Sequence, residues 1–525
     1  MSHPAKSGLG SSSARAVGIS RSSRLIPGWL AGPHRFRRVQ PFPILFAYSW
    51  VVGIFALSSS PLPHLWRPLI IALAFTSVIV FAGVVLARGT PKAQLIAGCV
   101  ALSLLGAWPF VAAMVVIGAW RFGVDRLRRR QARRAVDESA TPQVLRIANG
   151  FSWILAVVTS VNVVLSGGLG LRLPAASAQV LAGSEDHPNI YLVLLDGYPR
   201  ADTLLRDFNF DNGSFLAALG ARGFDVAGES RSNYTKTLMT LASVLNMDYT
   251  SSLERLTPPG DSAAAQARQL SAAINDSSSV ATLRSLGYEV VASGSAFGEV
   301  ALMSADVYLE SGGLTQFEHQ IARFTWLASV VDTVAPQWMP EEHRQSVRTA
   351  FANWQSVAEQ RSDQPRFMLT HVLSPHAPFV FTEDGSPHPV QECFPEQCAL
   401  WDTEMQATGL THAEISAGFT SQLVYLNGLI LDTADAVIAA DPDAVIVFFS
   451  DHGIRYDADD RDEFFRNFLA SRTPGHAALF PEDASPVNIL PLVLNTYSRS
   501  DLPMRSYEGW WSAEKPLDIE RYWPQ

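Results

Sequence analysis

The order of apolar and polar residues divides the chain near residue 170. Before that point, four apolar runs approach the ~20 residues that a helix needs to cross a bilayer: Pro41–Ser58, Pro68–Ala87, Leu95–Trp120 and Asn149–Gly170. The third run is the longest and has Trp108-Pro109 near its middle, so we predict two short helices that turn there. The front part then crosses the membrane five times, or four times if this run is one kinked helix.

After residue 188 the apolar runs become short and alternate with amphipathic segments. They predict strands at Asn189–Gly197, Phe224–Ala227, Gly287–Ser293, Arg366–Val372 and Asp443–Phe449. Helices are expected at Asn212–Ala221, Ser277–Leu286, Thr411–Ile438 and Pro486–Tyr497. Strands that alternate with helices indicate an α/β domain with a mostly parallel sheet and helices on both faces.

Charge follows the same division. Residues 1–170 hold 18 Lys/Arg and 3 Asp/Glu, although the whole chain has a formal net charge of −9. A basic, apolar front and an acidic back indicate a membrane anchor joined to a water-exposed domain. The basic residues alternate with apolar runs, so they fit membrane topology and argue against nucleic-acid binding. We expect a basic tail over 1–40, a transmembrane domain over 41–170, a linker over 171–188 and an exported domain over 189–525.

The arginines also set the expected orientation. The loop Arg121–Arg134 holds seven arginines and one acidic residue, and the tail is basic too. By the positive-inside rule both segments face the cytoplasm. With five crossings, the last run exports everything after it, so we expect a multi-pass protein of the plasma (inner) membrane with its large domain on the periplasmic or extracellular side.

The chain has three cysteines. Cys99 lies inside an apolar run, whereas Cys393 and Cys398 form a C-x4-C pair in ECFPEQC. This pair fits a local disulfide in an oxidising compartment, or half of a metal site.

Three of the predicted strands lead into acids or histidines. Asp196 follows the first strand, Asp451 and His452 follow the last, and HVLSPHAP places His371 and His376 at the end of another. Open α/β sheets place ligand sites at the carboxyl ends of their strands. A carboxylate beside an imidazole suits a divalent transition metal. The structural alternative is a helix-capping aspartate followed by a packed histidine.

A threonine-containing segment lies between the first two of these strand ends. SNYTKTLMTLASVLN, residues 232–246, has polar residues followed by a helical apolar pattern. A threonine at a helix start can be an N-cap, or it can be a nucleophile. Because a helix N-terminus favours anions, the same place suits a phosphate or sulfate group.

In chain order, LLDG, a threonine at a helix start, HVLSPHAP and SDHG resemble the motifs of the alkaline phosphatase/sulfatase superfamily. The likeness is greatest to its membrane-anchored bacterial branch, the phosphoethanolamine transferases and lipoteichoic-acid-synthase-type phosphoglycerol transferases. That branch also has several membrane spans before an exported catalytic domain. The resemblance runs from about Asn189 to the C-terminus and implies an alkaline phosphatase/sulfatase-like fold.

The resemblance implies a divalent metal ion, with zinc or manganese favoured by the ligand types. Asp196, Asp451 and His452 would bind it together with the oxygen of Thr237. Thr237 also resembles the nucleophile of the family, and Thr235 is the alternative.

The resemblance also suggests residues that bind the substrate. His376 resembles the histidine that contacts the transferred group. His371 resembles the additional histidine of the phosphoethanolamine branch, which serves a second metal or the substrate. Asn233 and Arg455 are further candidates, although Arg455 equally fits a solvated surface arginine.

We therefore expect a membrane-anchored, metal-dependent enzyme that transfers or hydrolyses phosphate esters, with a phospholipid or an envelope glycan as substrate. A sulfatase-like hydrolase is the alternative, but the C/S-x-P-x-R element of sulfatases is missing at the threonine position. Where transferases often carry a further histidine, this chain has Arg466-Asn467-Phe468, which leaves a second metal site open. An inactive envelope scaffold or binding protein is the non-enzymatic alternative.

The predicted topology can be tested with a reporter enzyme that is active only outside the cytoplasm. Fused after Gly170, the reporter should be active, because the last crossing exports it. Fused after Arg134, it should be inactive. An inactive reporter after Gly170 would overturn the topology.

Overall fold

The computed structural model describes most of the chain after residue 39. It covers 40–522, with gaps at 59, 87–89, 113–114, 117–118, 120–139, 166–186, 254–255, 257–261, 295–296, 327–329, 331–332, 336, 390–409, 455–459 and 513–514. The predicted pair Cys393 and Cys398 and the candidate Arg455 lie outside the described residues.

The apolar runs of the front part form helices close to the predicted places. They are α1 (Phe42–Leu57), α2 (Trp66–Leu86), α3 (Pro91–Leu104) and α5 (Ala140–Leu165). The helix α5 begins at Ala140 rather than at Asn149. The third run is broken, because α3 ends before a turn at Gly106, whose φ is +75°, and helix resumes at Trp108. Among the described residues the break therefore comes slightly before the predicted Trp108-Pro109.

Three helices of the described chain are long and apolar enough to cross a membrane: Leu62–Leu86, Gln143–Val164 and His412–Ala440. The last is α15, which buries Phe419, Leu423 and Ile430 in the core of the α/β domain. Its apolar character is thus explained by packing against the sheet. The candidate spans that remain lie in the front part, where α1 and α3 are shorter apolar helices.

A seven-stranded, mostly parallel sheet forms the centre of the second part, as predicted. Its order is β2-β7-β6-β1-β5-β3-β4. The strands are β1 (Ile190–Leu195), β2 (Asp225–Val226), β3 (Glu289–Ser293), β4 (Val307–Leu309), β5 (Arg366–Val372), β6 (Val445–Phe449) and β7 (Leu469–Arg472). Strand β1 runs parallel to both β5 and β6, whereas β7 and β2 are antiparallel at one edge.

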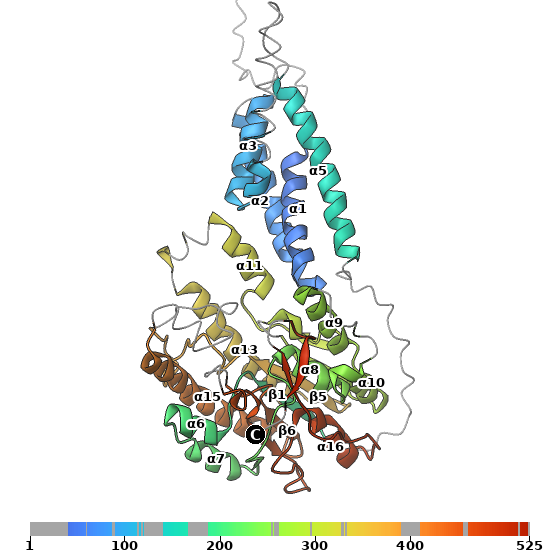
Figure 1. Ribbon diagram of the computed structural model, residues 1–525, viewed down its shortest axis with the longest axis vertical. Helices are drawn as coiled ribbons and strands as arrows, with labels where there is room; N and C mark the ends of the chain where they lie inside the picture. Colours follow the sequence, from blue (N-terminus) through green and yellow to red (C-terminus); the bar gives the residue numbers. More distant parts are fainter. Residues whose placement is uncertain are drawn as a thin grey trace, which may run out of the picture. The chain divides into compact units, whose positions relative to one another are not determined.

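Helices cover both faces of this sheet (Figure 1). One face is covered by α6 (Ala201–Phe208), α7 (Gly213–Gly220), α13 (Trp338–Glu359) and α15 (His412–Ala440). The other is covered by α8 (Thr237–Asn246), α9 (Ala263–Asn275), α10 (Ser278–Ser285) and α16 (Ile489–Tyr497). The remaining elements are α11 (Gln316–Phe324), the hairpin β8 (Gly509–Ser512) and β9 (Ile519–Tyr522), and short 3-10 turns at Leu62–Leu65, Thr250–Ser252, Gly298–Val300, Glu463–Phe465 and Pro486–Asn488.

The register of the central strands brings their carboxyl ends together. Leu194 of β1 pairs with His371 on one side and with Phe449 on the other. All six residues of β1 are buried, as expected for a strand covered on both faces. The residues that follow β1, β5 and β6 therefore meet at one edge of the sheet.

Several elements were not predicted from the sequence. The helix α13 has a readable signal, since its buried Val347, Phe351, Trp354 and Val357 recur at helical spacing. Its many polar residues obscure that pattern. Strand β7 is short and pairs antiparallel to β6, so only the assembled sheet identifies it.

His343 on α13 makes the stability of this domain depend on pH. It is 4% exposed, and burial, followed by the charges of His376 and His319, lowers its pKa from 6.5 to about 4. The unfolded chain takes up this proton near pH 6.5. The domain should therefore be fully stable above pH 6.5, and this group should lower the free energy of unfolding as the pH falls towards 4, by up to about 3 kcal/mol.

Thermal unfolding of the detergent-solubilised full chain between pH 7 and 5 tests this. The His343→Gln variant should lose less stability than the wild type over the same range. Parallel curves for the two proteins would show that His343 does not cause the pH dependence.

Candidate metal centre

Two buried carboxylates lie side by side at the edge where β1 and β6 end. Asp196 is 1% exposed and Asp451 is 0% exposed. The backbone N–H of Gly197 donates to Asp451 Oδ1 at 3.1 Å, and this bond joins the two strand ends. Burying two adjacent acids is unfavourable unless cations or hydrogen-bond donors surround them.

Two glycines allow this close approach. Gly197 has a φ of +67°, and a Cβ there would lie 3.3 Å from His452 Cε1. A Cβ on Gly453 would lie 2.0 Å from the carbonyl oxygen of Glu463, which leaves no room for a side chain. The glycines of LLDG and SDHG are thus required by backbone conformation and space.

The histidines are oriented by carbonyl groups of the following residues. His452 Nδ1 is 2.6 Å from the carbonyl oxygen of Gly453, and His376 Nδ1 is 2.7 Å from that of Ala377. Because a carbonyl can only accept, each Nδ1 carries the proton. In each neutral ring Nε2 then has the lone pair that a metal ion needs.

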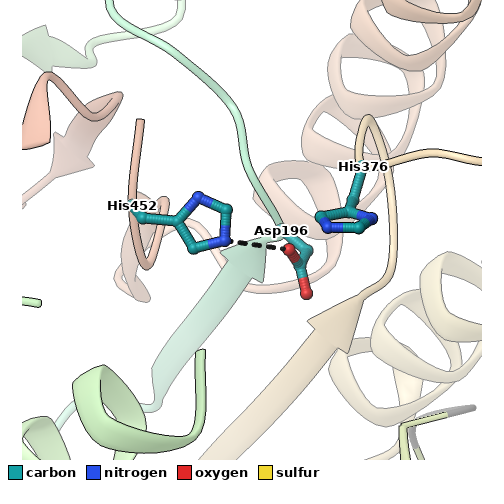
Figure 2. Close-up of side chains that lie close together, drawn as sticks. All are labelled: Asp196, His376 and His452. Atoms are coloured by element: carbon teal, nitrogen blue, oxygen red, sulfur yellow. Dashed lines mark ion pairs between the residues drawn. The ribbon is translucent and has the colours of Figure 1, made fainter. Parts of the chain in front are cut away.

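These groups converge on one point. Figure 2 shows Asp196 at the end of its strand, between the imidazoles of His376 and His452. One ligand atom from each of the three lies within 4.8 Å of the others. His452 Nε2 is 3.6 Å from Asp196 Oδ1 and 3.3 Å from Asp451 Oδ2. Neither carboxylate oxygen accepts a hydrogen bond from the described residues, so the donor set fits a divalent cation.

Burial and charge move the pKa values of the two acids in opposite directions. Burial would raise the pKa of Asp196, but the imidazoles of His376, His371 and His452 outweigh it and lower that pKa. Burial and the negative charge of Asp196 raise the pKa of Asp451 to about 6, against hydrogen bonds from Thr237 and Gly197. Such opposed shifts in adjacent acids are typical of functional sites.

Thr237 reaches the carboxylates from the start of α8. Its hydroxyl donates to Asp196 Oδ2 at 3.4 Å and also bonds to Asp451. One turn later, Thr240 Oγ1 donates to the backbone carbonyl of Asp451 at 2.8 Å. The first N–H groups of α8 are therefore beside the acids, where they favour an anionic ligand.

His371 lies at the end of β5 and bonds to the same carboxylate. Its Nε2 is 3.1 Å from Asp196 Oδ2, and because this carboxylate accepts, Nε2 donates. In this arrangement His371 supports Asp196 from the side opposite Thr237's helix, and its own Nε2 is occupied by a proton.

The other predicted residues are placed less directly. Thr235 is buried two residues before Thr237, and the hydrogen bond to Asp196 comes from Thr237. The side-chain amide of Asn233 accepts from Val487 N–H and donates to Tyr249 and the Glu508 carbonyl. It thereby ties the threonine loop to the C-terminal segment, and its role in substrate binding stays a prediction.

Sequence reasoning missed three residues that hold this site: Gly197, Thr240 and Ser450. The glycine had a signal, since it follows an acid directly after a buried strand. Thr240 lies one helical turn from Thr237 on α8 and could have been inferred from that spacing. Ser450 Oγ accepts from Tyr198 N–H and donates to the His452 carbonyl, bonds that no local pattern reveals.

Comparison with known proteins bears on this domain. Residues 239–481 match the family model described as Sulfatase. This segment contains both histidines of HVLSPHAP together with Asp451 and His452, and it begins just after Thr237. No curated protein sequence matches the chain.

Solved structures of low sequence identity are also similar. The C-terminal periplasmic domain of EptC from Escherichia coli, in complex with Zn, is 14% identical, with 67% of this chain and 96% of that chain covered and a TM-score of 0.42. The lipooligosaccharide phosphoethanolamine transferase EptA from Neisseria meningitidis is 12% identical, with coverages of 77% and 69% and a TM-score of 0.38. A Bacteroides thetaiotaomicron sulfatase (BT33494S-sulf) is 16% identical, with coverages of 64% and 84% and a TM-score of 0.39.

The match over residues 239–481 confirms the resemblance predicted from the strand-end motifs. The chain carries a sulfatase-family domain of the alkaline phosphatase superfamily.

Proposed function

We propose that this protein is a membrane-anchored, metal-dependent enzyme that transfers or hydrolyses phosphate esters through Thr237. One observation carries the proposal. The Thr237 hydroxyl lies at the start of α8 and bonds to two buried carboxylates that also face the Nε2 atom of a histidine. A hydroxyl in this place is both next to a cation site and at an anion-binding helix end.

Asp196, Asp451 and His452 would hold the metal ion, with Thr237 Oγ1 completing the site. His376 is close enough to be a further ligand. The two oxygens without hydrogen bonds and the imidazole nitrogens suit zinc or manganese. A bound divalent ion would supply positive charge that favours the deprotonated form of a nearby hydroxyl.

In the proposed reaction Thr237 Oγ1 attacks phosphorus in line with the leaving alcohol. The Oγ1–P bond forms, the P–O bond to the leaving group breaks, and the alcohol leaves with a proton. The threonine proton passes towards the carboxylate that its hydroxyl contacts, Asp196 Oδ2. Water or an acceptor alcohol then attacks the phosphothreonine, and Thr237 recovers its proton.

The residues around Thr237 have separate roles in this proposal. His376 faces the site and would donate to the non-bridging oxygens of the transferred group, where negative charge accumulates. The N–H groups at the start of α8 would act on the same oxygens. His371 holds Asp196 in place through its 3.1 Å hydrogen bond. Arg455, as predicted, would bind the anionic substrate.

A threonine at this position favours phosphate over sulfate esters. Sulfatases of the usual kind form their nucleophile from a Cys or Ser in a C/S-x-P-x-R element, which is absent around Thr237. Sulfate-ester hydrolysis is therefore the second candidate, supported by the family match alone. An inactive scaffold would not need two buried acids aimed at one point with a hydroxyl between them.

The apolar front helices support a substrate in or at the membrane. We propose that α1, α2, the broken third run and α5 anchor the chain in the plasma (inner) membrane, with residues 189–525 as an exported catalytic domain. An enzyme held at a bilayer meets phospholipids and lipid-linked glycans at high effective concentration. Transfer of a phospholipid head group is the first choice, and hydrolysis is close behind.

Metal analysis tests the cation site. The full chain, purified in detergent without chelator, should hold a stoichiometric divalent metal. Asp196→Asn and Asp451→Asn should weaken zinc binding by about 100-fold or more, because each removes a ligand charge. Asp435→Asn is the matched control, since this aspartate is exposed and pairs with Arg222. A wild type without metal, or three variants of equal affinity, would refute the site.

Mass spectrometry tests the nucleophile. After incubation with fluorescent phosphatidylethanolamine, the full chain should carry a phosphate-containing adduct on Thr237. Thr237→Ala should lose the adduct and about 10³-fold or more in turnover, whereas Thr235→Ala should retain the adduct. An adduct on Thr235, or full activity of Thr237→Ala, would contradict the mechanism. A 4-nitrophenyl sulfate control distinguishes sulfatase activity.

A further inference from the structure

The histidines of the metal centre lie on loops, and each loop is tied to the body of the domain by one buried carboxamide. We propose that Gln422 and Asn467 are positioning residues, which set the geometry of His376 and of Asp451-His452 respectively. The proposal rests on the proposed metal site. Neither residue belongs to the motifs of the sequence analysis as a functional group.

Gln422 is on α15 and is 0% exposed. Its Nε2 donates to the backbone carbonyls of Pro375 and His376, at 3.1 and 3.3 Å. Its Oε1 accepts from the backbone N–H of Val380 at 2.9 Å. One side chain therefore closes the loop on both sides of His376 and satisfies three buried backbone groups.

These bonds specify an amide. The loop presents two carbonyls, which need donors, and one N–H, which needs an acceptor. Glutamine supplies both kinds of group at once, whereas glutamate has no donor when ionised and methionine has neither. A carboxylate at position 422 would also face two carbonyl oxygens in a buried site, so the loop would have to move.

Asn467, just before β7, ties the other loop and is also 0% exposed. Its Nδ2 donates to the Ser450 carbonyl at 2.6 Å, and its Oδ1 accepts from Ser230 Oγ at 2.9 Å. Ser230 precedes the threonine loop, and Asn467 also forms an isolated backbone bridge with Pro199, after the Asp196 turn. The residue thus connects all three segments that bring Asp196, Thr237 and Asp451 together.

The hydrogen bonds continue from Asn467 to the metal ligands. Ser450, whose carbonyl Asn467 holds, donates through Oγ to the His452 carbonyl at 2.7 Å and accepts from Tyr198 N–H at 2.9 Å. The same Oγ is 3.4 Å from Asp451 Oδ1. A shift of the Ser450 carbonyl would therefore move both ligands that follow β6.

A purely structural role would give a different result from a positioning role, and two other buried amides serve as controls. Gln266 on α9 accepts from Leu517 N–H, and Asn246 at the end of α8 donates to the carbonyls of Ala242 and Ala273. Both are buried and bonded to the backbone, and neither bonds to a loop that carries a predicted ligand. Gln266→Glu and Asn246→Asp therefore report the cost of losing an amide donor elsewhere.

The experiment compares Gln422→Glu and Asn467→Asp with these controls in the full chain in detergent. Zinc affinity of the metal-free protein, the visible spectrum with cobalt, and kcat and KM are measured. Asn467→Asp should weaken zinc binding 10- to 100-fold and alter the cobalt spectrum, as loss of an outer partner of metal ligands does. Gln422→Glu should lower kcat 10- to 100-fold with KM little changed, and should weaken zinc binding only if His376 is a ligand.

Hydrogen exchange supplies a readout that is independent of activity. Without metal, Gln422→Glu should speed exchange at Val380, and Asn467→Asp should do so at Tyr198, while the controls leave both unchanged. If a charged variant does not accumulate, Gln422→Asn and Asn467→Gln displace the amide by one methylene and should show the same pattern. Variants that match their controls in affinity, spectrum and exchange overturn this proposal alone. A wild type that binds no metal overturns it together with the proposed function.

Discussion

The repulsion between Asp196 and Asp451 is the constraint on which the rest of the site depends. Two carboxylates buried at adjacent strand ends lose hydration and repel one another, which separates their pKa values, with that of Asp451 raised to about 6. The groups around them are donors or can carry positive charge. The backbone N–H of Gly197, the hydroxyl of Thr237 and the imidazole of His371 each bond to one of the acids. A divalent cation completes this pattern by neutralising the charge that these donors only partly offset.

The parallel sheet is what makes such a cluster possible. Strand β1 is flanked by β5 and β6, so three strand ends meet at one edge although they lie far apart in the sequence. The helix α8 adds its N-terminus and Thr237 from a fourth segment. No local part of the chain contains the site, so it forms only when the central strands have paired. This also explains why the ties between loops, through Ser230, Ser450 and Asn467, run between distant segments.

The elements that could be predicted from the sequence are those with a strong local pattern. The runs IYLVLL and VIVFF are apolar because both faces of β1 and β6 are covered, and the acids that follow mark the strand ends. The third apolar run announced its own break, at a glycine close to Trp108-Pro109. In contrast, Gln422 lies within an amphipathic helix, where a buried polar residue breaks no pattern. Its function depends on which loop folds over it, and that information is not local.

Asn467 also bears on how many metal ions the site can use. Its side chain is committed to Ser230 and Ser450 at the place where related transferases often have another histidine. His371 donates to Asp196, so its Nε2 is directed at a carboxylate. Among the residues that the structure describes, the group of potential ligands that come within 4.8 Å of one another is Asp196, His376 and His452. With one cation, the charge on a transferred phosphoryl group must be met by imidazole and by the N–H groups of α8. This makes the placement of the two histidine loops more important than it would be in a two-metal site.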